Sequence, residues 1–316
     1  MYHLEKTLDD GQNSWWKYVV IYFSQYFVAF SIGVVPSLII VVMNGGLNYT
    51  EQELDSMNLA QFGIGSNLNL VLLLIPSIVG LLTLTILLKP IHKRKLIDVI
   101  NGATGIRWGK FWFAMGLMSV LYGTYLSLDY LIYPKNYILN FNLESLVPLV
   151  FISFLLIPIQ STSEEVIFRG YLMQGVASWT NNRWAPLIIT SILFGLTHLF
   201  NSEISEYGFI YMMPQYLMFG LVFGLITILD DGIESAVGVH SAYNIFGSIF
   251  ITFEGSSLPT SALLQKIQFN SPLVWIAIWA GVIFIMGKKY NWNYSLLKGK
   301  ILETSSIKIP ETTDEN

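Results

Sequence analysis

Eight apolar stretches of the sequence contain no Asp, Glu, Lys or Arg, and they constrain the fold more than any other feature. Each is long enough, or nearly so, for a membrane helix of about 20 residues. A membrane β-strand would alternate polar and apolar residues, whereas these stretches are apolar on all sides. We therefore expect an all-α fold, a polytopic membrane bundle of about eight transmembrane helices. The stretches are residues 18–43, 67–88, 111–128, 146–163, 184–200, 207–229, 235–253 and 271–287.

The composition supports a membrane protein and excludes several kinds of site. Only 12% of the 316 residues are charged, whereas a soluble domain has about 25% charged residues. The net charge of -4, with no basic stripe, argues against nucleic acid as a partner. The sequence has no cysteine, which excludes disulfides, thiolate zinc sites and cysteine nucleophiles. The lipid bilayer is the partner that this composition predicts.

The basic residues predict the orientation, because Lys and Arg accumulate in cytoplasmic loops. With the N-terminus inside, all but three of the 17 Lys and Arg residues fall on the cytoplasmic side. Lys135 and Lys266 fall outside, and Arg169 lies within a helical stretch. We expect an integral protein of the plasma membrane with both termini in the cytoplasm. Its expected parts are a cytoplasmic segment (1–17), a three-span region (18–145), a core (146–287) and a polar cytoplasmic tail (288–316).

Ionisable residues inside a membrane are costly, so each is a candidate functional residue. The fourth stretch leads directly into Glu164, Glu165 and Arg169. Glu165 and Arg169 are four residues apart with the acid first, a spacing that favours an ion pair on one helix face. Glu164 points about 100° away from Glu165 on a helix. We therefore expect the two adjacent carboxylates to have different roles.

Three further polar residues lie in the apolar stretches: His198, His240 and Asn244. His240 and Asn244 are four apart and share a helix face. A helical hairpin that turns near residues 180–182 brings Glu164 level with His198, because about 17 residues separate each of them from the turn. His240 is about 12 Å from the turn at 230–232, so it falls in the same cytoplasmic half. The four side chains are expected to converge.

Two chemistries suit a carboxylate, two imidazoles and a carboxamide in a pocket of low dielectric. A desolvated carboxylate is a stronger base that takes a proton from water, and imidazole and amide groups then hold the developing oxyanion. Alternatively, Glu164, His198 and His240 hold a zinc ion that keeps one position open for water. Hydrolysis of an amide bond is the expected reaction.

Three motifs in this order on three apolar stretches resemble the CPBP family. This family comprises intramembrane CAAX prenyl endopeptidases and bacterial relatives associated with bacteriocin processing and self-immunity, formerly called Abi proteins. The resemblance spans about residues 164–244 and implies an intramembrane endopeptidase that acts on a membrane-associated protein or peptide. The motifs are Glu164-Glu165-x-x-x-Arg169, Phe194-x-x-x-His198 and His240-x-x-x-Asn244.

The resemblance also implies a role for each motif residue. Glu164 with His198 would activate the water, and His240 with Asn244 would stabilise the oxyanion. The neighbouring acid and the arginine of the first motif would be supporting residues. Members of the family are often called metalloproteases, but the motifs do not decide whether a metal is bound. We prefer a metal-free glutamate mechanism over the zinc alternative.

Plainer interpretations exist for the same residues. The Glu165–Arg169 pair alone is typical of helix stabilisation, and either histidine alone is typical of an interhelical hydrogen bond. Gly220 and Gly224 have the spacing of helix packing. The HExxH, GxSG and GxGD motifs of other intramembrane proteases are absent from the sequence. The alternative functions are a catalytically silent membrane scaffold or regulator, and a proton-coupled transporter, which no internal repeat supports.

Overall fold

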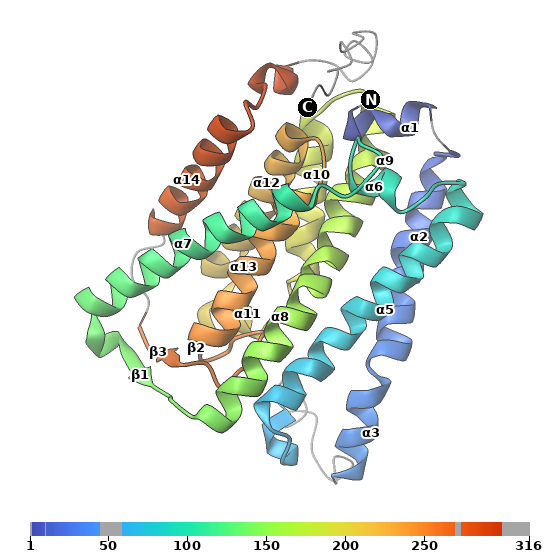
Figure 1. Ribbon diagram of the computed structural model, residues 1–316. Helices are drawn as coiled ribbons and strands as arrows, with labels where there is room; N and C mark the ends of the chain where they lie inside the picture. Colours follow the sequence, from blue (N-terminus) through green and yellow to red (C-terminus); the bar gives the residue numbers. More distant parts are fainter. Residues whose placement is uncertain (1, 10, 45–58, 269–272, 299–316) are drawn as a thin grey trace.

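The computed structural model describes residues 2–9, 11–44, 59–268 and 273–298, and these residues form a bundle of helices (Figure 1). The predicted all-α membrane bundle is confirmed, and each apolar stretch falls mainly on helix. The long elements are α2 (Trp15–Val28) with its continuation through the π-helical turn η2 (Ala29–Gly33) into α3 (Val35–Met43), α5 (Ser66–His92), α7 (Trp108–Ile132), α8 (Leu143–Glu165), α10 (Trp184–Thr197), α12 (Phe209–Asp230), α13 (Glu234–Phe250) and α14 (Leu273–Lys289).

The predicted spans differ in length. Within the described residues, five helical segments are long and apolar enough to cross a membrane by length and composition: Trp15–Met43, Ser66–His92, Trp108–Ile132, Leu143–Thr180 and Phe209–Asp230. The other three predicted spans lie on shorter helices, since α10 has 14 residues and α13 and α14 have 17 each. Helix α13 ends before its apolar stretch does, because the next three residues leave the helix to form a strand.

Short elements connect the long helices. They are η1 (His3–Glu5), α1 (Lys6–Asp9), η4 (Leu59–Phe62), α6 (Ile97–Ile100), η5 (Pro134–Asn136), η6 (Val166–Leu172), α9 (Met173–Thr180), α11 (Ser202–Tyr207) and η7 (Tyr294–Lys298). Three strands, β1 (Tyr137–Leu139), β2 (Ile251–Phe253) and β3 (Leu264–Lys266), form a small sheet in the order β1-β3-β2. Strand β3 pairs antiparallel with β1 and parallel with β2. This sheet lies at the end of the bundle away from α1, α6 and α9 (Figure 1).

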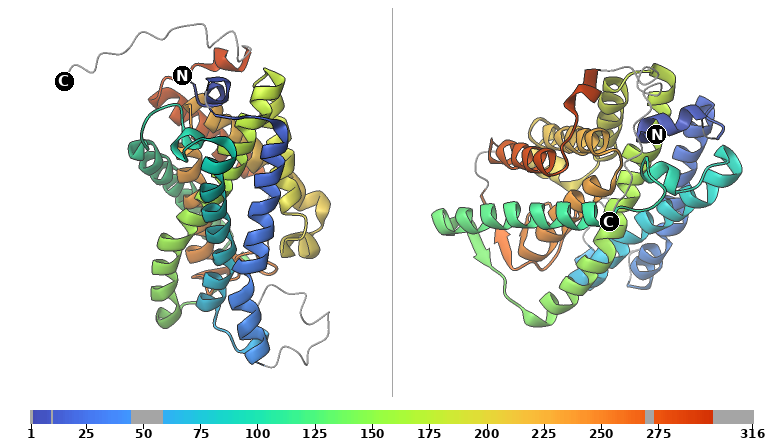
Figure 2. Two further views of the ribbon diagram at one scale, coloured as in Figure 1. Left: turned by 90° about the vertical axis from the view of Figure 1, so that its right-hand side faces the viewer. Right: turned by 45° about the horizontal axis from the view of Figure 1, so that its top comes forward.

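Helix α13 lies at the centre of the bundle and packs against α7, α8 and α12. Helix α5 packs between α2 and α8, and α10 packs against α12 and α9. The turned views show α8 beside α5 within the bundle (Figure 2). Gly238 allows α13 to approach α7 closely, because a Cβ there would lie 2.4 Å from the carbonyl oxygen of Phe111 on α7. The central position of α13 brings its polar residues toward α8.

Helix α8 continues without a break through η6 and α9, so residues 143–180 form one helical segment. The turn η6 has π-helical geometry, which is frequent at functional sites because it re-aims side chains and frees backbone carbonyls. The segment ends at Asn181, whose φ of 48° is left-handed, and α10 begins at Trp184. The predicted hairpin turn near residues 180–182 is therefore confirmed.

Buried polar contacts fasten the N-terminal segment to the bundle. The His3 ring donates from Nε2 to the carbonyl oxygen of Arg169 at 3.2 Å, and its backbone N–H donates to the Asp231 carboxylate. Arg183 pairs with Glu5 at 2.7 Å, and both side chains are buried. Burial lowers the pKa of His3 to about 4 and raises the pKa of Asp231 to about 6. The first residues are thus part of the packed structure.

Gly220 and Gly224 allow α12 to approach α10 closely. A Cβ at Gly220 would lie 2.7 Å from the Cα of Ser191, and one at Gly224 would lie 2.6 Å from a methyl carbon of Leu187. The packing role predicted from their spacing is confirmed. Close backbone approach of this kind is a main source of helix association in membranes.

Gly220→Ala should destabilise the protein by about 1–3 kcal/mol, because the added methyl group meets backbone of α10. Thermal unfolding of the purified protein in detergent measures the loss. Gly116→Ala on α7 is the matched control, since no atom lies within 4 Å of the Cβ it would add. The control should keep or raise the melting temperature because alanine favours helix. Equal melting temperatures for the two variants would contradict the packing role of Gly220.

Candidate active site

The two adjacent carboxylates at the end of α8 have different surroundings. Glu165 is fully buried and forms an ion pair with the fully buried Arg169, with 3.0 Å between Oε1 and Nη1. The Glu164 side chain is 24% exposed and makes no ion pair with Arg169 in the described residues. The ion pair expected from the spacing is confirmed, and the two carboxylates differ in their surroundings. Glu164 is the carboxylate that a reactant can reach.

Arg169 connects three helical segments through its guanidinium group. Nη2 donates to the carbonyl oxygens of Phe219 and Gly220 on α12, each at 3.3 Å. The guanidinium carbon also lies 4.3 Å from the centre of the Phe194 ring on α10, a distance at which a cation is attracted to the ring face. Arg169 therefore fixes the position of the Glu165 carboxylate relative to α10 and α12.

His240 on α13 lies between the two carboxylates. Its Nδ1 lies 2.8 Å from Glu165 Oε1, and its Nε2 lies 3.8 Å from Glu164 Oε2. The ring stacks on Phe223, with 4.9 Å between ring centres and 24° between planes. A hydrogen bond from Nδ1 to a carboxylate fixes the tautomer and the orientation of an imidazole. Glu165 therefore orients His240 so that Nε2 faces Glu164.

Gln160 is a site residue that the sequence analysis missed. It lies one turn before Glu164 on α8, and its Nε2 donates to Glu164 Oε1. Its Oε1 accepts a hydrogen bond from Asn244 Nδ2 at 3.1 Å. Gln160 thus joins the exposed carboxylate to the carboxamide of α13. The spacing of four residues before Glu164 was the available signal, together with an amide in an otherwise apolar stretch.

His198 follows the last residue of α10 and caps that helix. Its Nδ1 donates to the carbonyl oxygen of Phe194 at 2.7 Å, which leaves Nε2 free to accept a proton. The Phe194 ring lies 4.5 Å from the His198 ring and 6.5 Å from the His240 ring, and Glu164 is close enough to affect the ionisation of His198. The hairpin of α9 and α10 therefore brings His198 to the Glu164 side of the site, as the predicted register requires.

The predicted residues form one site around the end of α8. Glu165, Arg169 and His240 are joined by direct contacts, Glu164 and Asn244 are joined through Gln160, and the Phe194 ring lies between His198 and His240. The catalytic roles of these residues stay predictions. Oε2 of Glu165 and Nε of Arg169 have no hydrogen-bond partner among the described residues.

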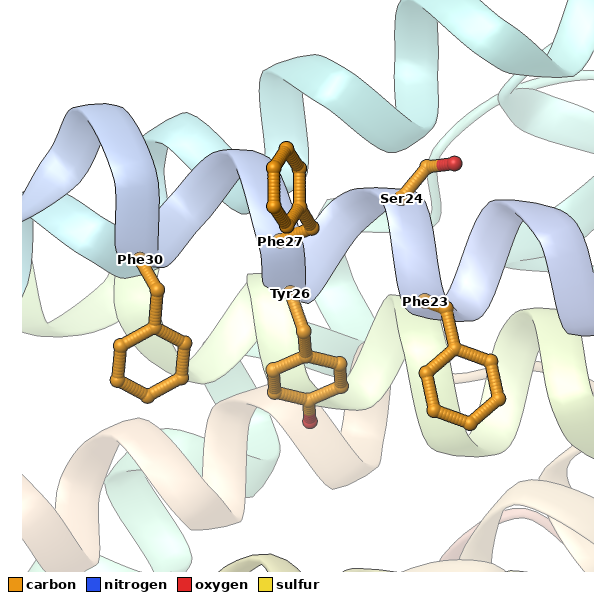
Figure 3. Close-up of a pocket in the computed structure, with 5 residues that line it drawn as sticks. All are labelled: Phe23, Ser24, Tyr26, Phe27 and Phe30. Carbon is orange, nitrogen blue, oxygen red and sulfur yellow. The ribbon is translucent and has the colours of Figure 1, made fainter.

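An open pocket of about 590 Å³ lies on α2 beside this site. Figure 3 shows Tyr26 between Phe23 and Phe30, with the three rings on the same side of the helix. Ser24 and Phe27 complete the lining. Tyr26 is close enough to Thr197 and Glu164 for both to affect its ionisation. Helix α2 therefore supplies one wall next to Glu164, which the motifs alone do not indicate.

The zinc alternative requires Glu164, His198 and His240 to converge on one point. Among the described residues, no group of three or more His, Asp or Glu side chains is arranged to hold a metal ion. Nδ1 of His240 bonds Glu165 and Nδ1 of His198 bonds a backbone carbonyl, as in many zinc sites, so the missing convergence and not these bonds speaks against zinc. The side chains as arranged do not fit a three-ligand zinc site.

The start of α13 is fixed by charged contacts outside the apolar stretches. Arg107 donates to both carboxylate oxygens of Glu234, at 3.0 and 2.5 Å. Burial would raise the pKa of Glu234, but the hydrogen bonds and charge of Arg107 outweigh it and hold this pKa below its usual range. Lys110 pairs with Asp230 at 2.8 Å. The Arg107 contacts tie α13, and thereby His240, to the start of α7, and Lys110 ties the end of α12 to the same helix.

Arg169→Ala should destabilise the protein by about 3–5 kcal/mol, because it leaves a buried carboxylate without its counter-charge. The melting temperature in detergent measures this loss. The double variant Glu165→Gln with Arg169→Gln should recover part of it, since no buried charge is then left unpaired. An Arg169→Ala protein as stable as the wild type would show that the pair does not hold the site together.

Two of three comparisons relate the chain to known proteins. Residues 144–246 match the sequence profile of the family described as type II CAAX prenyl endopeptidase Rce1-like. This match confirms the resemblance drawn from the three motifs, and it contains all their residues. The chain is also 34% identical over 170 residues to the uncharacterized protein YyaK of Bacillus subtilis. The aligned region is 52% of this chain and 56% of the relative, so the chain spans just over half of its length. No solved structure matches the chain.

Proposed function

We propose that this protein is a membrane-embedded endopeptidase that uses Glu164 to activate water. The observation that carries the proposal is the position of His240, held by a buried carboxylate on one side and facing the accessible Glu164 on the other. Glu165, which is paired with Arg169, suits the role of a group that orients the imidazole, and the partly exposed Glu164 suits the role of a general base. The Rce1-like match over the same residues supports this reading.

The reaction begins with Glu164 and His198 beside a water molecule. Glu164 takes a proton from the water while the oxygen attacks the scissile carbonyl carbon, and a tetrahedral oxyanion forms. His198, with a free Nε2, assists this proton transfer. The C–N bond then breaks as the proton passes to the leaving nitrogen, which yields a carboxylic acid and an amine. No covalent intermediate with the enzyme is required.

His240 and Asn244 are proposed to stabilise the oxyanion. Asn244 donates one N–H to Gln160, and its second N–H is available because a carboxamide has two. His240 donates from Nε2 only when both ring nitrogens carry protons. A doubly protonated ring would lie between two carboxylates, at 2.8 and 3.8 Å, which supply the counter-charge. Fixed donors of this kind cost no reorganisation during the reaction.

The metal-free glutamate mechanism is the version that we propose. The bonds from His240 to Glu165 and from His198 to a backbone carbonyl orient both rings for proton transfer. A zinc site would have to draw Glu164, His198 and His240 together. The mechanism above therefore contains no step through a metal.

A peptide or a segment of a membrane protein is the proposed substrate. The aromatic wall of α2 beside Glu164 suits an apolar segment in the bilayer. The resemblance to the CPBP family supports bacteriocin processing or self-immunity as the setting. We also propose a plasma-membrane location with both termini in the cytoplasm, supported by the biased basic residues. Segments α1, α6 and α9 gather at the end where the N-terminus lies (Figure 1).

Glu164→Gln should abolish peptide cleavage and leave folding intact, because it removes the base and keeps the shape of the side chain. Purified protein is incubated with synthetic transmembrane and amphipathic peptides, and cleavage is read by mass spectrometry. We expect a loss of at least about 100-fold, the size of a general-base contribution. Glu144→Gln, at the exposed start of the same helix, should cleave normally. Unchanged cleavage by Glu164→Gln would overturn the proposal.

The same preparations test the two alternative functions. A wild-type protein that binds peptides and cleaves none would favour a silent scaffold. Proton movement in proteoliposomes that is lost in Glu164→Gln would favour a transporter. His198→Ala and the double variant with Glu164→Gln should lose cleavage to the same extent as the single variant, because the two residues act as one unit.

Chelation tests the metal-free mechanism. Cleavage should be unchanged after incubation with EDTA or 1,10-phenanthroline, because no step requires a bound ion. The Glu164-dependent fraction of cleavage is the quantity to follow, since it removes any contaminating protease from the comparison. Loss of that fraction on chelation, with recovery when zinc is added, would favour the zinc alternative.

A further inference from the structure

We propose that Tyr216 and Glu203 are positioning residues for His198. Neither belongs to the three motifs. They form a chain of contacts in which Glu203 holds Tyr216 and Tyr216 holds the His198 ring. This role deepens the proposed function and rests on it, because a fixed His198 matters only if its Nε2 takes part in proton transfer.

The His198 ring makes few contacts that fix its orientation. Its hydrogen bonds are made through Nδ1, to the carbonyl oxygen of Phe194 at 2.7 Å and to the adjacent Thr197 hydroxyl at 3.3 Å. Tyr216 on α12 stacks on the ring, with 4.4 Å between ring centres and 27° between planes. The Phe194 ring lies 4.5 Å away at 44°. The stack with Tyr216 therefore restricts rotation of the imidazole about its bond to Cβ.

Tyr216 is itself held by hydrogen bonds at its hydroxyl group. The hydroxyl donates to Glu203 Oε2 at 3.1 Å and accepts from Asn201 Nδ2 at 2.9 Å. Asn201 and Glu203 follow His198 closely in the chain, at the start of α11. The same short segment that carries His198 thus returns to anchor the ring that stacks on it.

Glu203 is buried, with 7% of its surface exposed, and its carboxylate is well bonded. Besides Tyr216, it accepts from the backbone N–H of Ser257 at 2.7 Å and from the Ser257 hydroxyl. A buried carboxylate with this set of donors is fixed in place, so it is a rigid support for Tyr216.

A purely structural role for Glu203 would be to fasten the loop at Ser257 to α11. The two roles predict different outcomes when the Glu203 and Tyr216 variants are combined. If Glu203 acts on His198 through Tyr216, then Glu203→Gln and Tyr216→Phe break the same link, and their effects are not additive. If Glu203 only fastens the loop, the two effects add, and the imidazole is unaffected.

The first measurement reads His198 directly. The protein is labelled with ¹⁵N at its four histidines, and the His198 signals are identified by their loss in His198→Gln. In the wild type we expect one tautomer with the proton on Nδ1. Glu203→Gln and Tyr216→Phe should show exchange between two tautomers. Glu206→Gln on α11 and Tyr211→Phe on α12, both at exposed positions, are the matched controls and should resemble the wild type.

The second measurement is the kinetics of Glu164-dependent cleavage of a peptide found in the test above. Each variant should lower kcat about 10-fold, as for other residues that orient a reacting group, with KM and melting temperature unchanged. The double variant should also lose about 10-fold. A single fixed tautomer in both variants, or a loss of about 100-fold in the double variant, would overturn the positioning role.

The two measurements separate this proposal from the proposed function. If the wild type cleaves no peptide, the endopeptidase proposal fails, while the tautomer of His198 still decides whether Tyr216 and Glu203 position it. If Glu203→Gln does not fold, Tyr216→Phe decides the question alone, because it keeps the ring and removes only the link to Glu203.

Discussion

The buried ion pair of Glu165 and Arg169 is the interaction on which the rest of the site depends. Both side chains are fully buried, and an isolated charge in such a place would be very costly. The cost is offset because Arg169 also bonds two carbonyls of α12 and lies over the Phe194 ring. The pair therefore fixes α8 against α10 and α12, and it leaves Glu165 Oε1 in position to bond His240.

That arrangement separates two carboxylates that are neighbours in the chain. Glu165 faces inward and orients an imidazole, whereas Glu164 is partly exposed and is bonded by Gln160. The 3.8 Å between Glu164 and His240 Nε2 is longer than a hydrogen bond, so the two groups are close without being joined. A reactant can interact with both. His198 is held by different means, through an aromatic stack on Tyr216.

Much of the fold and the outline of the site could be predicted from the sequence, because each prediction needed only local rules. Long apolar stretches require helices in a membrane, a spacing of four pairs Glu165 with Arg169, and equal distances from a turn bring Glu164 level with His198. The end of α13 was not predicted, because Ile251–Phe253 are apolar and β-prone, and their pairing with β3 depends on residues far along the chain.

The sequence by itself determined the bundle, the order of its helices and the six candidate site residues, since hydropathy and helical periodicity act over short range. Only the tertiary structure decided which groups share hydrogen bonds. It brought His240 to Glu165, placed Gln160 between Glu164 and Asn244, and anchored Tyr216 on Glu203. The physical reason is that such bonds depend on the rotation and depth of packed helices, which close contacts such as Gly220 against Ser191 set.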